Sequence, residues 1–361
     1  MPSNILKKST ALCAVLMLTG CYVPMPFEKY EITAPVEPEL HTMPEIECVA
    51  DEMHGKEWYS EMCSQLMEFR NSCTVSERMK TKEIGNALLQ MKNDYPEFFW
   101  YGRSYYATTV TDGSEINLGT PDWFDMDDLP EMYEEFVSKA DELIESIPDG
   151  SDYDKVLYVH DYIIEHTVYD MEAYKSNDTI ISGTAYACLV DGLAVCEGYA
   201  RAFQYIMNRI GIESGVCSGS NHAWNYVNID GEYYWLDATW DDNEETPPQH
   251  TYFLFNDDML LRTRTLNSTQ PDYHKCTSTN SNYFVVNGGY FDEYNEESVI
   301  EYIESKVDSG RCEIMFADFE NYKSALYALF SDAKIRKADG VGSSELKYYR
   351  DDDMFSVDII F

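Results

Sequence analysis

Three side chains in the middle of the chain have the types and the order of a thiol-based catalytic site. Cys196 begins the stretch CEGYARAFQYIMNRIG, and His222 and Asp237 lie in two aromatic-rich runs joined at Asp230-Gly231. A thiolate is a strong nucleophile, an imidazole can exchange a proton with it, and a carboxylate can hold that imidazole in one tautomer. The three residue types together predict nucleophilic catalysis.

The segment after Cys196 is predicted to be an amphipathic helix. Apolar residues recur along it at helical spacing, at Phe203, Ile206, Met207 and Ile210, and Gly211 is the expected C-terminal stop. Free amides and the helix dipole favour an anion at the first residue of such a helix, and therefore the thiolate form of Cys196. The alternative is an ordinary buried thiol, because cysteine is among the most buried residue types.

The two aromatic-rich runs are predicted to form a hairpin with its turn at Asp230-Gly231, the strongest two-residue turn signal. Such a turn pairs Trp224 with Asp237 and His222 with Thr239. Side chains alternate between faces along a strand, so these four would share one face. His222 and Asp237 become diagonal neighbours with Cα atoms about 7–8 Å apart, within reach of a hydrogen bond between their side chains.

Three stretches carry a resemblance to a known family. AVCEGYARAFQYIMNRIGI, NHAWNYV and YYWLDATWDD resemble the three blocks of the transglutaminase-like superfamily, in its bacterial secreted branch, across roughly residues 150–260. The resemblance implies an α+β, papain-like core in which a central helix carries the nucleophile and packs against an antiparallel sheet. It also implies that Cys196 is the nucleophile, His222 the general base and acid, and Asp237 the residue that orients His222.

Several residues around these three could support the chemistry. The Cys196 backbone amide is one expected oxyanion donor, and Tyr186 is a candidate for the second, with core packing as its alternative. Trp224, Trp235 and Trp240 are expected either to wall the cleft and shield it from water or to pack in the core.

No metal site and no cofactor are predicted. The acidic cluster Asp241, Asp242, Glu244 and Glu245 could hold calcium, as in some animal relatives, but it lacks a glycine-punctuated loop, so a solvated loop is expected. His160 is expected to be an exposed or hydrogen-bonded helix residue rather than a ligand. Eight cysteines follow Cys21, and none of them forms a Cys-x-x-Cys pair. If one of the eight is a reactive thiol, seven remain; because disulfides use cysteines in pairs, at least one of the seven should not form a disulfide within the chain.

The charge balance excludes one class of partner. The chain has 26 Lys and Arg against 65 Asp and Glu, a net charge of −39, and this charge would repel nucleic acid. Such acidity is typical of a soluble extracellular surface. An acidic patch that attracts cationic substrates is the alternative.

The N-terminus resembles a secretory signal. Lys7 and Lys8 precede the short apolar run STALCAVLMLTG, which is too short to span a membrane and remain there. Leu18 to Cys21 resembles the bacterial lipobox, in which the cysteine is acylated and becomes the first mature residue. We therefore expect lipid anchoring through Cys21 at the extracytoplasmic face of the cell membrane; an ordinary secretory signal is the alternative.

The remaining patterns suggest the domain organisation. Residues 51–97 have helical spacing, Asp112-Gly113 is a hairpin signal, and residues 129–147 and 152–168 are predicted helices. The segments expected are a signal peptide (1–20), a proline-rich acidic tether (21–50), a helical N-terminal region with a β-hairpin (51–150), the catalytic core (151–275), and a small α+β C-terminal region (276–361) in the order strand, helix, strand, strand.

The expected function follows from the resemblance and the three residues. A thiol enzyme would act on protein or peptide amide bonds through a thioester, with cell-wall peptides or lysine-rich proteins as candidate substrates. Hydrolysis is favoured over acyl transfer from glutamine to an amine, because nothing in the sequence indicates a tunnel that excludes water. Two competing hypotheses are a binding module without turnover and an adhesive surface lipoprotein.

Overall fold

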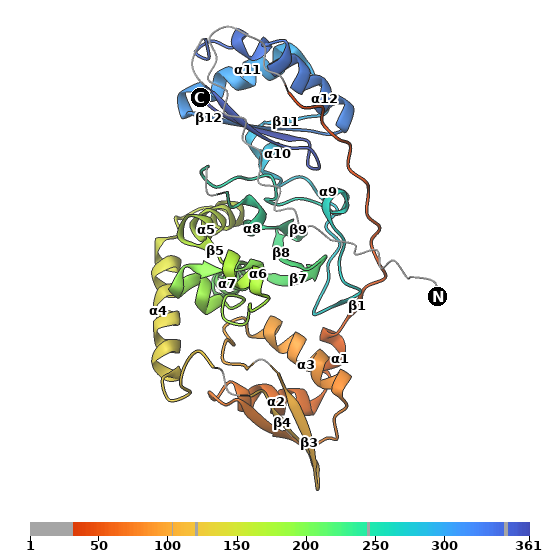
Figure 1. Cartoon of the computed structure of the whole chain (residues 1–361), viewed down its shortest axis with the longest axis vertical. Coiled ribbons are helices and arrows are strands. Elements are labelled where there is room, and N and C mark those ends of the chain that lie inside the picture. Colours follow the sequence, from red (N-terminus) through yellow and green to blue (C-terminus); the bar gives the residue numbers. More distant parts are fainter. Residues whose placement is uncertain (1–31, 103, 120–121, 244–245, 343–345) are drawn as a thin grey trace, which may run out of the picture. The chain divides into compact units, whose positions relative to one another are not determined.

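The chain folds into two compact units. The computed structural model describes residues 32–361 except 103, 120–121, 244–245 and 343–345 (Figure 1). The larger unit is formed by residues 39–286, and the smaller by residues 32–38 together with 287–361. The predicted signal peptide and Cys21 lie outside the described residues. Within the described part, no helix is both long and apolar enough to cross a membrane.

The larger unit mixes helices with short sheets. Its helices are α1 (Ala50–His54), α2 (Glu57–Leu66), α3 (Thr81–Asp94), α4 (Leu129–Ser146), α5 (Asp152–His166), α6 (Met171–Ser176), α7 (Cys196–Arg209), α8 (Ala238–Asp241), α9 (Asp257–Thr263) and α10 (Tyr283–Asn287), with a π-helical turn at Ala187–Asp191. Its strands are β1 (Glu47–Cys48), β2 (Ser72–Val75), β3 (Tyr106–Val110), β4 (Gly113–Asn117), β5 (Val168–Tyr169), β6 (Leu193–Ala194), β7 (Ser214–Gly219), β8 (His222–Ile229), β9 (Glu232–Leu236) and β10 (Thr269–Gln270).

Helix α7 packs against the antiparallel sheet β7-β8-β9 (Figure 1). The helix begins at Cys196, as predicted, and every residue from Gly198 to Met207 is buried. It ends before Gly211, whose φ of +82° suits glycine. The fold is therefore α+β, with a cysteine-bearing helix on an antiparallel sheet, as the sequence predicted.

The predicted hairpin turn and register are confirmed. Asp230 and Gly231 both have positive φ, which matches the twist of adjacent antiparallel strands. The ladder runs from the pair Ile229–Glu232 to the pair Asn225–Leu236, and this is the predicted register.

The hairpin ends three pairs earlier than predicted, at the pair Asn225–Leu236. Strand β9 stops at Leu236, and Asp237 becomes the N-cap of α8, with its side chain accepting a hydrogen bond from the Trp240 N–H at 3.2 Å. The expected pairs Trp224–Asp237 and His222–Thr239 are therefore replaced by a helix cap. The reason is that an aspartate side chain can satisfy a free amide at a helix start better than it can extend a strand.

Several other elements match their predictions. Helices α4 and α5 lie where the spacing placed them, and β3 and β4 form the hairpin signalled at Asp112-Gly113. Its turn is Thr111-Asp112, because Gly113 already pairs with Val110. The expected helical stretch 51–97 is interrupted by β2, which pairs with β4 to form the sheet β2-β4-β3. Cys73 and Val75 of β2 are buried, so long-range packing overrides the local helical spacing there.

One hydrophobic core runs through the larger unit. Buried residues of α2, α3, α4, α5 and α7 belong to a single continuous cluster, which includes Trp100, Phe136 and Phe203. The region before residue 150 therefore shares its core with the helix that begins at Cys196.

The smaller unit has its own core and sheet. Its elements are β11 (Tyr290–Phe291), α11 (Glu296–Lys306), a 3₁₀ turn at Val307–Ser309, β12 (Arg311–Phe316), α12 (Phe319–Leu326), a π-helical turn at Tyr327–Ser331, a 3₁₀ turn at Lys334–Lys337, β13 (Lys347–Asp351) and β14 (Ser356–Ile360). The sheet order is β11-β12-β14-β13. From β12 onward the main elements follow the predicted order of strand, helix, strand and strand. Arg350 donates hydrogen bonds to Thr33, which joins the segment 32–38 to this unit.

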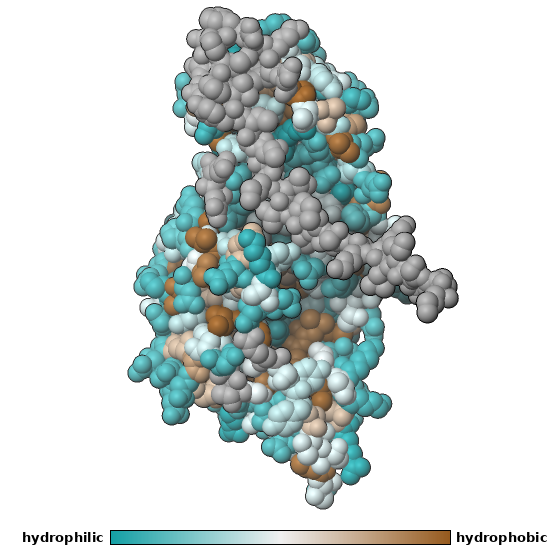
Figure 2. All heavy atoms as spheres, viewed as in Figure 1, coloured by the Kyte–Doolittle hydropathy of each residue, from teal (hydrophilic) through white to brown (hydrophobic). Residues whose placement is uncertain are grey.

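The face of the molecule drawn in Figure 2 is mostly hydrophilic, with hydrophobic residues scattered or in small groups. This agrees with the strong excess of Asp and Glu in the sequence. A surface of this kind remains well hydrated.

Candidate active site

Cys196 lies at the N-terminus of α7 and is partly exposed. It packs against a small cluster made by Ala200, Val216 and Ala223, which come from α7, β7 and β8. Cys196 is the first residue of the helix, so no carbonyl group one turn earlier in α7 can accept a hydrogen bond from its backbone N–H. The thiol and this amide are therefore both available at the helix start.

Gly198 allows the start of α7 to approach a neighbouring segment closely. A Cβ atom at this position would lie 2.4 Å from the Ser182 carbonyl oxygen and 3.0 Å from that of Thr184. The Val195 N–H donates to the same Ser182 carbonyl at 2.8 Å. The glycine in the sequence Cys-Glu-Gly therefore fixes where the thiol-bearing end of α7 lies.

The structure brings the three predicted residues together. His222 Nε2 lies 2.7 Å from Asp237 Oδ2, and the two side chains are 10% and 1% exposed. Cys196 is the other neighbour of the His222 ring that raises its pKa. Because Nε2 faces Asp237, Nδ1 is the ring nitrogen left for the thiol. Helix α7, strand β8 and the cap of α8 each contribute one residue.

The surroundings of His222 stabilise its protonated form. Burial favours the neutral ring, but the charges of Asp237 and Cys196 and hydrogen bonds to both raise the pKa of His222 to about 9. Burial alone would raise the pKa of Asp237, yet His222 and Arg264 hold it below its usual value. The site therefore favours an imidazolium between a carboxylate and the thiol at neutral pH.

Two tryptophans enclose the His222 ring. Trp224 stacks with it at a centroid distance of 5.8 Å, and Trp240 at 5.2 Å. Trp235 instead contacts Trp224 and donates its indole N–H to Asp257 at 2.8 Å. Of the three predicted tryptophans, Trp224 and Trp240 contact the His222 ring. Trp224 and Trp235 are both fully buried, and Trp235 packs against Trp224.

Arg264 belongs to the site and was not found from the sequence. It follows α9, is 1% exposed, and donates from Nη2 to Asp237 Oδ2 at 2.7 Å. Its guanidinium lies 4.0 Å from the Trp240 ring centre and 4.5 Å from that of Trp224. The stretch LLRTRTLN contains no local signal that separates this arginine from its neighbour Arg262.

Tyr186 packs in the core, which was the alternative to its role as a donor. Its hydroxyl donates to Glu135 at 3.2 Å, and its ring contacts Phe99 and Trp123. The backbone amide of Cys196 therefore remains the oxyanion donor with the clearest structural basis.

The acidic segment after the site differs from the expected solvated loop. Asp241 is fully buried; it accepts hydrogen bonds from the Tyr252 N–H at 2.9 Å and lies 3.2 Å from His160 Nε2. Asp242 accepts a hydrogen bond from the Tyr199 hydroxyl at 2.6 Å. The solvated-loop prediction is wrong for Asp241. Its buried carboxylate is the hydrogen-bond partner of the buried Tyr252 N–H and of His160 Nε2, and buried polar groups of this kind need such a partner. Glu244 and Glu245 lie outside the described residues.

The eight cysteines in the described part of the chain are all free thiols. Six are buried, and Cys48 and Cys196 are partly exposed. The pKa of the Cys48 thiol is raised by burial and by the negative charges of Asp272 and Asp51. The two partly exposed thiols thus differ in their neighbours: Cys48 lies near Asp272 and Asp51, and Cys196 lies near the His222 ring.

Replacing Arg264 by Gln should lower the free energy of unfolding by about 3–5 kcal/mol, because loss of one partner from a buried ion pair leaves the other charge uncompensated. Urea unfolding followed by circular dichroism measures this change. The matched control is Arg209→Gln, which breaks a half-exposed pair with Asp141 at 2.6 Å and should cost only about 0.2–1 kcal/mol. Equal, small effects of the two substitutions would contradict the structural role of Arg264.

Comparisons with known proteins agree with the resemblance. Residues 141–244 match the model of the transglutaminase-like superfamily. No curated protein matches the chain at a significant level. Among solved structures, a crystal structure of a TGase is 19% identical with a TM-score of 0.28, and the match covers 46% of this chain and 50% of that one.

Two further solved structures are similar to parts of the chain. A protein from Cytophaga hutchinsonii named a "putative cysteine protease" is 16% identical, with a TM-score of 0.23, over 38% of this chain and 61% of that one. A "putative protease" from Parabacteroides distasonis is 15% identical, with a TM-score of 0.22, over 38% of this chain and 37% of that one.

This chain thus spans about half the length of the TGase structure that it matches. The family match covers Cys196, His222 and Asp237, which the fold brings into one site. The segment that contains these three residues is thus the part of the chain that matches the transglutaminase-like superfamily.

Proposed function

We propose that this protein is a thiol enzyme that hydrolyses amide bonds of proteins or peptides through a thioester on Cys196. The observation that carries the proposal is the position of His222, whose ring is hydrogen-bonded to Asp237 and lies close enough to Cys196 for that thiol to contribute to its raised pKa. A protonated imidazole beside the thiol stabilises a thiolate, which is the nucleophilic form.

Each catalytic step can be assigned to one of these groups. The Cys196 thiolate attacks the amide carbon, and the backbone amide of Cys196 faces the developing oxyanion. His222 then gives its proton to the leaving nitrogen as the carbon–nitrogen bond breaks. A water molecule, deprotonated by His222, attacks the thioester and releases the acid. Asp237 stabilises the imidazolium and fixes the ring orientation throughout.

Acyl transfer to an amine is the alternative outcome of the same thioester. It would require the site to exclude water while admitting a neutral lysine. Cys196 is partly exposed, and this supports access of water to the thioester. The net charge of −39 would attract lysine-bearing proteins, but it attracts basic peptides for cleavage equally well. Hydrolysis is therefore the proposed reaction.

We further propose that the enzyme acts outside the cytoplasm, anchored through acylated Cys21. The support is the basic start, the short apolar run and the Leu18 to Cys21 motif in the sequence. Candidate substrates are peptides of the cell wall or lysine-rich proteins at the same face of the membrane.

Iodoacetamide at mildly acidic pH should label Cys196 about tenfold faster than Cys48, because His222 supplies a positive charge to the first thiol and Asp272 a negative charge to the second. Mass spectrometry of peptides after short labelling times measures both rates in one sample. His222→Asn should remove the difference. Labelling of both thiols at the same rate in the unsubstituted protein would argue against an activated nucleophile.

Incubation with a denatured protein rich in Gln and Lys, together with a tagged primary amine, should produce new peptide termini without incorporation of the amine. Cys196→Ala should abolish the cleavage, and a proteomic search for new N-termini measures it. Amine incorporation without new termini would instead identify a transferase.

The same assay has an expected pH dependence. Because the pKa of His222 is raised to about 9, the imidazolium is present below that pH and is lost above it. The cleavage rate should therefore fall as the pH rises through about 9. In the Asp237→Asn variant this decline should begin at lower pH, because one of the two groups that raise the His222 pKa has lost its charge.

Cys21→Ser should release the protein from the membrane fraction or block its maturation, because acyl chains hold it there in the proposed arrangement. Fractionation of cells followed by immunoblotting measures this. Retention in the membrane at the level of the unsubstituted protein would remove the proposed anchor.

A further inference from the structure

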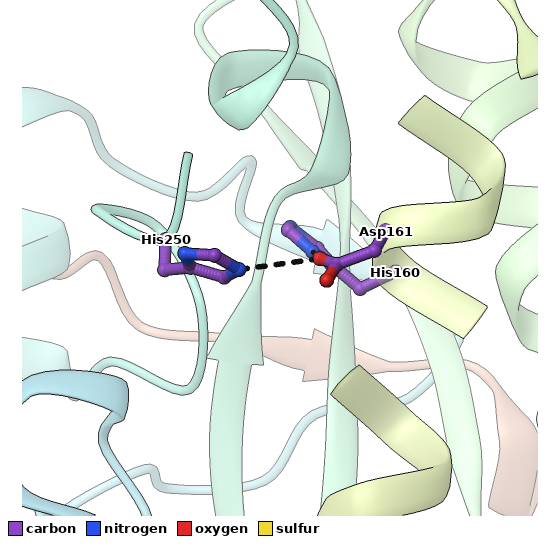
Figure 3. Close-up of side chains that lie close together, drawn as sticks. All are labelled: His160, Asp161 and His250. Carbon is purple, nitrogen blue, oxygen red and sulfur yellow. Dashed lines mark hydrogen bonds and ion pairs between the residues drawn. The ribbon is translucent and has the colours of Figure 1, made fainter. Parts of the chain in front are cut away.

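A second group of reactive side chains lies outside the thiol site. His160 and Asp161 are neighbours in α5, and His250 lies in the segment between α8 and α9. One donor atom from each lies within 4.8 Å of the other two (Figure 3). Asp161 Oδ1 is 2.9 Å from His160 Nδ1 and 3.2 Å from His250 Nε2. Three potential metal ligands therefore converge on one point.

The spacing and the atom types suit a transition metal. Around a tetrahedral ion with ligand bonds of about 2.0–2.1 Å, neighbouring ligand atoms lie about 3.3 Å apart. The distances from Asp161 Oδ1 to the two histidine nitrogens, 2.9 and 3.2 Å, are close to this value. Two imidazoles and one carboxylate are ligands that Zn²⁺ accepts. Ca²⁺ and Mg²⁺ require six or more oxygen ligands or retained waters, which this nitrogen-rich set does not offer.

A fourth residue, Asp241, holds His160 through the ring nitrogen that faces away from Asp161. His160 Nε2 lies 3.2 Å from Asp241 Oδ2, and both side chains are fully buried. Asp241 is itself held by the Tyr252 N–H, which donates to both carboxylate oxygens. A carboxylate on the far nitrogen fixes the ring orientation and tautomer of a metal-binding histidine and leaves Nδ1 for the ion.

The other two ligands are also held in place, and one side of the cluster reaches solvent. The His250 ring stacks on Tyr283 with centroids 3.9 Å apart. His250 is 9% exposed in its side chain, whereas Asp161 is 34% exposed. An ion could therefore enter on the Asp161 side, and water could occupy its fourth position.

We propose that His160, Asp161 and His250 bind a zinc-type divalent ion, with Asp241 orienting His160 from outside the ligand set. The ion would join α5 to the segment that contains His250. Through Asp241 it would also fix the end of α8, the helix whose N-cap is Asp237. None of the proposed ligands belongs to the thiol site. The ion would therefore act by stabilising the segment that holds Asp237, and not in the reaction itself.

The test measures metal binding in the full chain that carries Cys196→Ala, since a thiol beside an imidazole could itself bind the ion. Isothermal titration with Zn²⁺ should give one site per chain. The electronic spectrum with Co²⁺ should show nitrogen and oxygen ligation without the charge-transfer band of a thiolate ligand. In the same protein, Zn²⁺ should raise the melting temperature and a chelator should reverse the rise.

Substitutions in this background should separate the site from other histidines. His250→Ala and Asp161→Asn should each weaken Zn²⁺ binding at least tenfold; because Asp161 is partly exposed, its isosteric change is the variant expected to preserve the fold. The control is His274→Ala, since His274 Nε2 lies 3.4 Å from Asp272 and 3.8 Å from Glu213 but forms no comparable His and Asp set in the described residues.

Two results would overturn the proposal. The first is the lack of Zn²⁺ and Co²⁺ binding by folded Cys196→Ala protein, which would mean that protons alone hold the cluster together. The second is binding that Asp161→Asn and His250→Ala leave unchanged, or binding with a thiolate band, either of which would assign the ion to other residues. Neither result depends on the catalytic activity.

Discussion

The buried carboxylate of Asp237 is the constraint on which the site depends. One oxygen, Oδ2, accepts hydrogen bonds from His222 and from Arg264, each at 2.7 Å. An ionised carboxylate that is 1% exposed requires such partners, because burial without them would neutralise it. Two positive groups on a single oxygen keep the charge in place. The end of β9, the start of α8 and the residue after α9 must therefore meet at one point.

The backbone secures this meeting point through Tyr252. Its carbonyl accepts the Asp237 N–H at 3.0 Å, and its N–H donates to the Asp241 carboxylate at 2.9 Å. One residue thus fixes both ends of the short helix α8. His160 reaches Asp241 from α5, so a helix far away in the sequence supports the same turn. The orientation of Asp237 is consequently a property of the folded unit and not of the hairpin alone.

Local patterns predicted part of this arrangement. The start of α7 and the hairpin register follow from helical periodicity and from the Asp230-Gly231 turn, which depend on nearby residues only. The burial of Asp241 and the contribution of Arg264 depend on contacts between distant segments. Neither a run of acidic residues nor a single arginine forms a periodic pattern or a turn motif that would indicate such a contact. The burial of Asp241 and the role of Arg264 were therefore found only in the structure.

The free thiols have a consequence for how the protein responds to its surroundings. All eight cysteines in the described part of the chain are reduced, and six are buried. In the described residues, therefore, packing alone holds these cysteines in place. Oxidants can reach the partly exposed Cys48 and Cys196 most readily. Oxidation of the Cys196 thiol would therefore block the proposed chemistry, whereas burial shields the six other thiols.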